Sequence, residues 1–293
     1  MNDKRTLKFY YFKPFLYKDG KKNRAFNFAD WIINFENAAK IYKTISLSSI
    51  MARVDGHEYD KDKDLHGVCF VNMRGENLPS KVAEGKGQED LDLEESEYIG
   101  EDMYVLYDRS NNVFMAQSNR MALTINRITE FVNRTKDLND DMVVGFVPVT
   151  RNLSRKELKN KKVRSILISC ENLHEKDKME SSALKSICDT ADGFGCLTYS
   201  LKLGVGRKRN AELSPAESQK MIDDIINRAI DVKSAQVSIA DQLTGELEYV
   251  DLIQNKVCSI LEYKIGKRER LQLSKLFPVM VAEYLKIKSK NYF

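Results

Sequence analysis

The first half of the chain alternates between strand-like and helix-like hydrophobic patterns. Residues 7–16 are rich in aromatic and apolar side chains and predict a strand that turns at Asp19-Gly20. Asn27 precedes apolar residues at helical spacing, which predicts a helix over residues 28–39 with Asn27 as its N-cap. Further elements are expected at 45–54 and 65–73 (strands joined across Asp55-Gly56 and a polar excursion), at 103–107 and 113–118 (a hairpin), and after Thr124 (a helix).

The second half continues with strands and one strongly marked helix. Ser214, Pro215 and Glu217 carry the start signal of that helix, in which Ser214 is the N-cap and Glu217 is expected to complete a capping box. A final amphipathic helix is expected over residues 271–290. Strands are expected at 142–149, 163–170, 197–204, 237–240 and 247–253.

Apolar residues become sparse at residues 135–141, which predicts a boundary between two domains. We assign residues 1–137 to an N-terminal α+β domain and residues 138–293 to a C-terminal α+β domain with a basic patch. The length of 293 residues is sufficient for two such cores. The predicted fold class is therefore α+β, with mixed or antiparallel sheets and packed helices.

The composition indicates a globular protein of a reducing compartment. Hydrophobic residues make up 42% of the chain and charged residues 31%, and no apolar run is long enough to cross a membrane. Residues 1–5 lack the apolar stretch of a secretory signal. The five cysteines are scattered and form no CxxC pair, as expected of buried thiols. We therefore expect a cytoplasmic protein without membrane insertion.

Charge is distributed unevenly along the chain although the net charge is only +4. Residues 80–102 contain nine acidic residues and two lysines, whereas residues 256–293 contain nine basic and three acidic residues. Such separation can produce strong local fields under a modest total charge. Either segment is alternatively an ordinary solvated face.

A cationic turn follows the strand expected at 197–204. Gly204 and Gly206 loosen the backbone there, and Arg207, Lys208 and Arg209 follow directly. Three consecutive cations at a strand end are suited to contact phosphates of a nucleic-acid backbone, although a solvated basic turn is the alternative. The glycine spacing is not that of a P-loop. Candidate DNA-binding residues are therefore Arg207, Lys208 and Arg209, with a second patch at Lys264, Lys267, Arg268 and Arg270.

One spacing suggests an enzyme instead. Asp251 is followed by Glu262 and Lys264, a pattern similar to the D…ExK core of restriction-endonuclease-like nucleases. In that family the two carboxylates hold Mg²⁺ and the lysine positions or activates the attacking water. A short motif of this kind also arises by chance, as an incidental ion pair on a strand edge. The histidines at 57, 66 and 174 show no metal-ligand spacing, so no zinc site is expected, and His57 is interpreted as a turn residue.

The order of elements resembles that of the RexA-like family of phage exclusion proteins. The resemblance covers the aromatic first strand, the charged turn at 18–24, the acidic stretch ending in residues 97–100, the hairpin at 103–118 and the basic strand end at 201–209. It implies a dimeric, sequence-nonspecific DNA-binding protein that acts in abortive infection without enzymatic activity. Residues 134–194 do not match obviously in loop length.

Association with other molecules is expected in two forms. A homodimer would present two basic patches to double-stranded DNA, and two-fold dimers are the commonest closed assembly. The consecutive aromatic residues Tyr10, Tyr11 and Phe12 suggest that some of these side chains leave the domain's own core. A third hypothesis is a defence-system component that senses a partner protein through the acidic segment and binds no nucleic acid.

Overall fold

The computed structural model describes residues 2–136, 141–151, 161–171, 179–195, 198–206, 208, 211–226, 232–242, 245, 247–253 and 256–293. The chain forms two compact units. The first unit contains residues 1–149, 260–291 and 293, and the second contains residues 150–259 and 292.

These bounds differ from the expected division after residue 137. Strand β10 (Val143–Pro148) pairs with β1 (Asn2–Lys18), so the chain is still part of the first unit at that point. The chain also returns to the first unit at residue 260. Both differences from the expected boundary arise from contacts between residues that are remote in sequence. A local decrease in apolar residues gives no information about such contacts.

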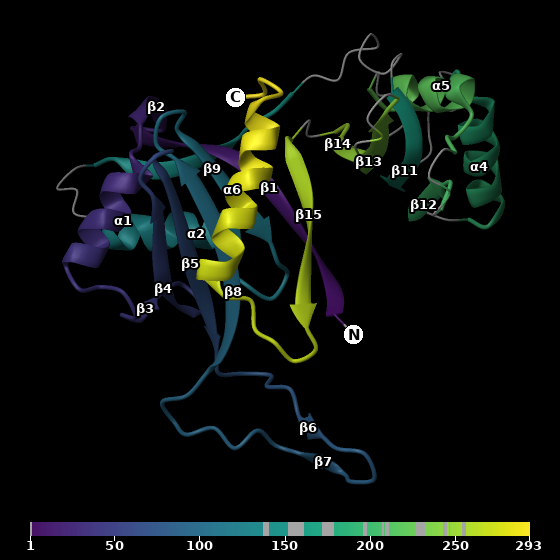
Figure 1. The fold of residues 1–293 in the computed structure, drawn as a ribbon. Coiled ribbons are helices and arrows are strands. Elements are labelled where there is room, and N and C mark those ends of the chain that lie inside the picture. Colours follow the sequence, from purple (N-terminus) through teal and green to yellow (C-terminus); the bar gives the residue numbers. More distant parts are fainter. Residues whose placement is uncertain are drawn as a thin grey trace. The chain divides into compact units, whose positions relative to one another are not determined.

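The first unit is built on one large sheet with strand order β10-β1-β9-β8-β5-β4-β3 (Figure 1). Strands β2 and β15 also pair with β1. Neighbouring strands in this order run antiparallel. The remaining strands are β2 (Lys21–Ala25), β3 (Ile45–Ser46), β4 (Met51–Asp60), β5 (Leu65–Arg74), β8 (Ile99–Asp108), β9 (Val113–Ser118) and β15 (Cys258–Gly266).

The turn expected at Asp55-Gly56 does not exist. Both residues lie inside β4, where the pairing with β5 shifts register between Val54 and Gly56. The chain reverses instead at residues 61–64. Gly56 lies at a β-bulge rather than in a turn. Glycine is common in both arrangements, so its presence in the sequence does not distinguish them.

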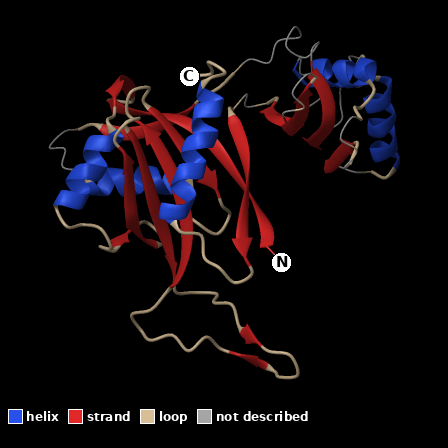
Figure 2. Cartoon of the chain, viewed as in Figure 1, coloured by secondary structure: helices blue, strands red, loops and turns tan. Residues whose placement is uncertain are grey.

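Helices cover both faces of this sheet (Figures 1 and 2). Helices α1 (Phe28–Asn37) and α2 (Ile125–Thr135) pack on one face, where the Trp31 ring stacks on Phe70 at 6.3 Å between centroids. Helix α6 (Leu273–Lys288) packs on β4, β5 and β8 of the opposite face, with Phe277 directly above Gly67. The α+β class is confirmed. Among the helices of the described part of the chain, none is long and apolar enough to cross a membrane.

Two-sided coverage explains the consecutive aromatic residues of β1. Phe9 and Tyr11 are buried on the α6 face, where the Tyr11 ring stacks on Tyr284. Phe12 belongs to the core on the α1 and α2 face, and Tyr10 packs against that core. The sheet therefore absorbs the side chains that we expected to leave the core, and the homodimer stays a prediction without this argument.

The second unit contains a four-stranded antiparallel sheet with order β12-β11-β13-β14. Its core includes Ile166, Ile168, Leu184, Ile222 and Val237. The elements are β11 (Lys161–Glu171), α4 (Ser182–Gly193), β12 (Thr198–Gly204), α5 (Pro215–Ile226), β13 (Val232–Asp241) and β14 (Leu247–Asp251).

The capping box expected at the start of α5 is not the role that Glu217 plays. Its carboxylate accepts hydrogen bonds from the start of α4, namely from Ser181 Oγ at 3.3 Å and the Ala183 amide at 3.5 Å. Asp224, further along α5, accepts from the backbone amides of Glu180 and Ser181, both at 2.9 Å. The acidic residues of α5 thus hold the beginning of α4, a helix that the hydrophobic pattern had not revealed.

The acidic segment leaves the main sheet between β5 and β8 as an exposed arm (Figure 1). Its strands β6 (Lys81–Val82) and β7 (Gln88–Glu89) pair only with each other among the described residues. Lys81 and Glu89 face each other across this pair at 3.4 Å. Most of the predicted negative charge therefore lies on a solvated extension.

Candidate anion-binding site

A cationic β-hairpin stands at one end of the first unit's sheet. Strands β1 and β2 are joined by Asp19 and Gly20, both in the left-handed region with φ of 50° and 73°. We call this the basic hairpin and define it by its exposed cations Lys18, Lys21, Lys22 and Arg24. Asp19 is the one acidic residue in this stretch. The ammonium of Lys22 lies 3.3 Å from the centre of the Phe15 ring, so the hairpin combines positive charge with an aromatic surface.

The chain passes from this hairpin directly into α1. Phe26 turns into the core, and Asn27 Oδ1 accepts the amides of Ala29 at 3.1 Å and Asp30 at 3.3 Å. This side-chain cap starts the helix as the sequence predicted. It also sets the helical phase, which places Trp31 four residues before Phe35 on one buried face.

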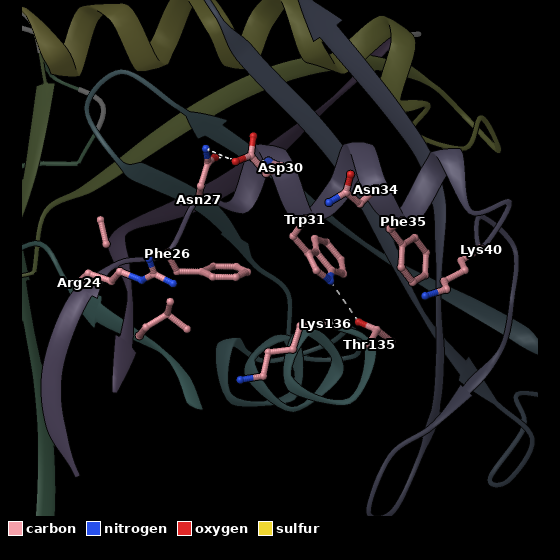
Figure 3. Close-up of a pocket in the computed structure, with 12 residues that line it drawn as sticks. Arg24, Phe26, Asn27, Asp30, Trp31, Asn34, Phe35, Lys40, Thr135 and Lys136 are labelled. Carbon is pink, nitrogen blue, oxygen red and sulfur yellow. Dashed lines mark hydrogen bonds between the residues drawn. The ribbon is translucent and has the colours of Figure 1, made fainter. Parts of the chain in front are cut away.

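A pocket of about 310 Å³ lies between β2, α1 and the end of α2. The buried aromatic residues Phe26, Trp31 and Phe35 line it. The indole Nε1 of Trp31 donates to Thr135 Oγ1 at 3.3 Å, which holds the ring against the last turn of α2. Figure 3 shows these side chains around the pocket. The other lining residues are Leu16, Arg24, Ala25, Asn27, Asp30, Asn34, Lys40, Thr135 and Lys136.

The charged groups of the pocket are mainly cationic. Arg24 extends toward the Phe26 ring, the Lys136 side chain lies at the end of α2, and Lys40 lies beside Phe35 (Figure 3). Lys136 Nζ donates to the Met142 carbonyl, a contact that leaves its charge in place. Among the described residues that line the pocket, Asp30 is the one carboxylate, and its Oδ1 already pairs with Arg109, outside the pocket, at 2.8 Å.

This arrangement can bind an anion that also carries an apolar group. Cationic side chains attract the anion, and the rings of Phe26, Trp31 and Phe35 offer an apolar wall. The amides of Asn27 and Asn34 add polar groups at the same opening. A second hollow, of about 580 Å³, lacks this bias because its arginines are matched by acids. Its charged lining residues are Arg5, Arg120, Arg270, Glu101, Asp102 and Glu269.

The cationic turn predicted after β12 lies largely outside the described residues. Arg207 and Arg209 are not among them. Lys208 is exposed, and Gly206 has a φ of 62°, so the backbone there adopts the glycine-favouring conformation that the sequence suggested. The DNA-binding role of this turn stays a prediction.

The second predicted patch is divided by the structure. Lys264 lies on β15, and Lys267 and Arg268 in the turn after it, all exposed. Arg270 instead pairs with Asp102, at 2.9 Å from Nε, and with Asp55, at 3.3 Å. The hydrogen bond to Asp102 raises the pKa of Arg270 above its usual value. Arg270 is therefore committed to acidic neighbours, whereas the other three cations face solvent.

The residues of the D…ExK pattern have contacts of their own. Asp251 lies at the end of β14 in the second unit, where Oδ1 accepts the Ile253 amide at 3.0 Å. Glu262 and Lys264 share the exposed face of β15 in the first unit, and Glu262 pairs with Lys4 at 2.7 Å. Mg²⁺ binding by Asp251 and Glu262 stays an untested prediction.

Comparison with protein families assigns nearly the whole chain to one family. A family model matches residues 1–292. The chain belongs to that family, described as a family of unknown function (DUF6731). No curated protein matches the chain. The family description names no activity.

A second polar cluster lies under the C-terminal end of α1. His57 on β4 contacts Glu36 Oε2 through Nδ1 at 2.8 Å and His66 Nδ1 through Nε2 at 3.1 Å. His66 Nε2 lies 3.5 Å from Asp64 Oδ1, and the Tyr59 ring stacks on the His66 ring at 4.4 Å. Burial and then the neighbouring His57 lower the pKa of His66. His57 is thus one of two buried imidazoles that lie between the more exposed carboxylates of Glu36 and Asp64, rather than a turn residue.

The composition of this cluster, two histidines and two carboxylates, would suit a metal ion, but its geometry does not. In the part of the chain that the structure describes, no three His, Cys, Asp or Glu side chains gather as metal ligands would. Neither the histidine pair nor the pocket was predicted from the sequence. Residues 57 and 66 meet through the pairing of β4 with β5, and an alternation count outward from the turn at 61–64 would have placed them on one face.

Proposed function

We propose that the protein binds double-stranded DNA without sequence preference, through the phosphate backbone. The basic hairpin carries this proposal. Lys18, Lys21, Lys22 and Arg24 are all exposed, with Asp19 as the nearest acid in sequence. A protruding two-stranded element with closely spaced cations can approach phosphates without deforming the rest of the sheet. Each neutralised phosphate releases counterions, which is the main source of affinity in nonspecific binding.

The exposed residues Lys264, Lys267 and Arg268 support the same proposal as a further cationic surface. Arg270 leaves it because of its pairs with Asp102 and Asp55. Arg207, Lys208 and Arg209 stay within the proposal. DNA contacts distributed over several short cationic segments are usual for proteins that read the backbone rather than the bases.

The proposed biological role follows from the resemblance to phage exclusion proteins. In this role the protein acts in the cytoplasm during abortive infection. It forms a homodimer and works with a partner protein of the defence system. One observation favours a protein-interaction role beside DNA binding. The arm that carries β6 and β7 is exposed along its length and strongly acidic, and Val82 at its tip is 67% exposed. A charged arm with an uncovered apolar side chain is suited to a basic protein surface.

Mobility-shift titration at low salt tests the DNA proposal with several unrelated duplexes of equal length. Equal affinity for all of them is the expected result. The triple variant Lys18→Gln/Lys21→Gln/Lys22→Gln should bind at least tenfold more weakly, since three charge-assisted contacts are removed. Lys61→Gln/Lys63→Gln/Lys275→Gln is the matched control, because it removes the same charge from exposed positions outside the hairpin.

Two outcomes would contradict the proposal. If the folded protein shifts no duplex at low salt, DNA binding is refuted and the protein-interaction role of the acidic arm is favoured. Cleavage of plasmid DNA with Mg²⁺ that is abolished by Glu262→Ala would establish the nuclease instead.

A further inference from the structure

We propose that the pocket between β2, α1 and α2 binds a nucleoside monophosphate group. The group is either a free nucleotide or the phosphorylated end of a nucleic-acid strand. The strand-end form rests on the proposed function, because the basic hairpin would then hold the phosphates that follow. The free-nucleotide form is independent of it.

Side chains, rather than a helix end, supply the phosphate contacts. The first amides of α1 are already used by Asn27, so the helix start offers no open cradle. Arg24, on β2, and Lys136, the residue after α2, both line the pocket and bring positive charge to it (Figure 3). A planar guanidinium can bind two phosphate oxygens at once, and an ammonium adds a compact charge. The pairing of Asp30 with Arg109 and with Asn27 Nδ2 reduces its repulsion of a bound phosphate.

The apolar wall selects a ligand with a ring. Phe26, Trp31 and Phe35 are almost fully buried, yet each contributes to the pocket lining, so a ligand meets the small accessible part of each ring. Aromatic rings pack favourably against a flat base, both offset-stacked and edge-to-face. Asn34 is exposed at this opening and can hydrogen-bond to a base or sugar.

The size of the pocket limits the ligand to one nucleotide. Its volume of about 310 Å³ is at the lower end of the range of about 300–1,000 Å³ for small-molecule sites. A bare phosphate would leave the aromatic wall empty, and a dinucleotide would exceed the space. Arg24 and Ala25 belong to both the pocket and β2, so a strand that entered the pocket would continue along the basic hairpin.

Intrinsic fluorescence reports on this site alone. Trp31 is the single tryptophan of the chain and lies in the pocket wall. We expect adenosine monophosphate and thymidine monophosphate to change its emission in a saturable manner. Adenosine and inorganic phosphate, used separately, should bind at least tenfold more weakly, because each engages only half of the site. An equal response to inorganic phosphate, or no response to either nucleotide, would overturn the proposal.

Variants assign the contacts. Arg24→Gln should weaken nucleotide binding by about tenfold or more, in line with the loss of a charge-assisted pair. Arg24 is exposed, so its replacement leaves the core unchanged. Lys136→Gln should act in the same direction, and Lys61→Gln, in the exposed turn between β4 and β5, is the control that should bind as the unaltered protein does. Unchanged affinity in Arg24→Gln and Lys136→Gln would refute the assignment.

Short oligothymidylates separate the two sources of the ligand. A strand with a 5′-phosphate that changes Trp31 emission at least tenfold more tightly than the unphosphorylated strand identifies a strand end. Equal behaviour of the two strands, together with binding of free nucleotide, identifies the free nucleotide. If the protein shifts duplex DNA but Trp31 does not respond to nucleotides, the pocket proposal is refuted and the DNA proposal is retained. If Trp31 responds to nucleotides but no duplex is shifted, the DNA proposal is refuted and the pocket proposal is retained.

Discussion

Tyr284 on α6 donates a hydrogen bond of 2.6 Å to Oδ2 of Asp108, the buried last residue of β8. Lys288, one helical turn later, donates to the same oxygen at 2.9 Å. Ser110 Oγ and the Asn111 amide satisfy Oδ1 at 2.6 Å and 3.0 Å. A buried carboxylate with these partners fastens the C-terminal helix to a strand that is far away in sequence.

Removing the Tyr284 hydroxyl should destabilise the first unit. Tyr284→Phe should lower the free energy of unfolding by about 1.5–3 kcal/mol, the usual value for a hydrogen bond to a charged group. Urea denaturation measures the change. Tyr42→Phe is the control, because Tyr42 is 62% exposed and its hydroxyl should contribute little. Equal stabilities of the two variants would contradict this role of Tyr284.

Asp108 should make the protein sensitive to strong acid. Burial raises the pKa of this carboxyl, but the hydrogen bonds from Ser110, Tyr284, Lys288 and Asn111 outweigh it and lower the pKa to about 2, from 3.8. A lowered carboxyl pKa stabilises the folded state above the unfolded value and loses that effect as pH falls through the folded value. About 2 kcal/mol should therefore be lost between about pH 4 and pH 2. Asp108→Asn should show a correspondingly smaller loss in unfolding curves over this range.

The histidine pair should act at milder pH. The pKa of His66 lies below 6.5 because the ring is buried and faces His57, while Asp64 acts in the opposite direction. The unfolded chain therefore takes up a proton before the folded one, so stability should fall as pH drops below about 6.5. Thermal unfolding between about pH 7.5 and pH 5 measures this effect. His66→Gln should flatten the dependence, and an unchanged slope would exclude His66 as its source.

Gly67 is required by the packing of α6. A Cβ built on this residue lies 2.4 Å from Cδ2 of Phe277, a buried ring that has no room to move aside freely. Gly67→Ala should cost about 1–3 kcal/mol through overpacking, and Phe277→Leu in the same chain should recover part of it. Gly87→Ala is the control, because its Cβ would meet no atom within 4 Å. Additive losses in the double variant would contradict the contact.

Salt dependence can count the phosphates that the basic hairpin contacts. Each neutralised phosphate of duplex DNA contributes about −0.9 to the slope of log affinity against log salt. The Lys18→Gln/Lys21→Gln/Lys22→Gln variant should therefore have a slope less steep by up to about 2.7. Fluorescence anisotropy over a series of salt concentrations gives this slope. A weaker variant with an unchanged slope would show that the lysines act without contacting DNA.

Local sequence was enough for many elements of the fold. Asn27 and Thr124 cap α1 and α2 as their spacing predicted, and Asp19-Gly20 forms the first turn. These features depend on residues only a few positions apart, whose backbone preferences act within one turn. The prediction of a turn at Asp55-Gly56 was wrong because a bulge and a turn favour the same residues. The pairing of β4 with β5 decides between them.

The candidate sites depended on contacts between remote residues. Lys136 comes from the end of α2, more than a hundred residues after Arg24, yet both line one pocket with Trp31. Arg270 looked like part of a basic patch until Asp102 and Asp55 were found beside it. Composition and periodicity could indicate charge, caps and apolar faces, because these are properties of neighbouring residues. Only the folded sheet decided which charges meet an acid, which face solvent and which surround a cavity, since long-range strand pairing brings those groups together.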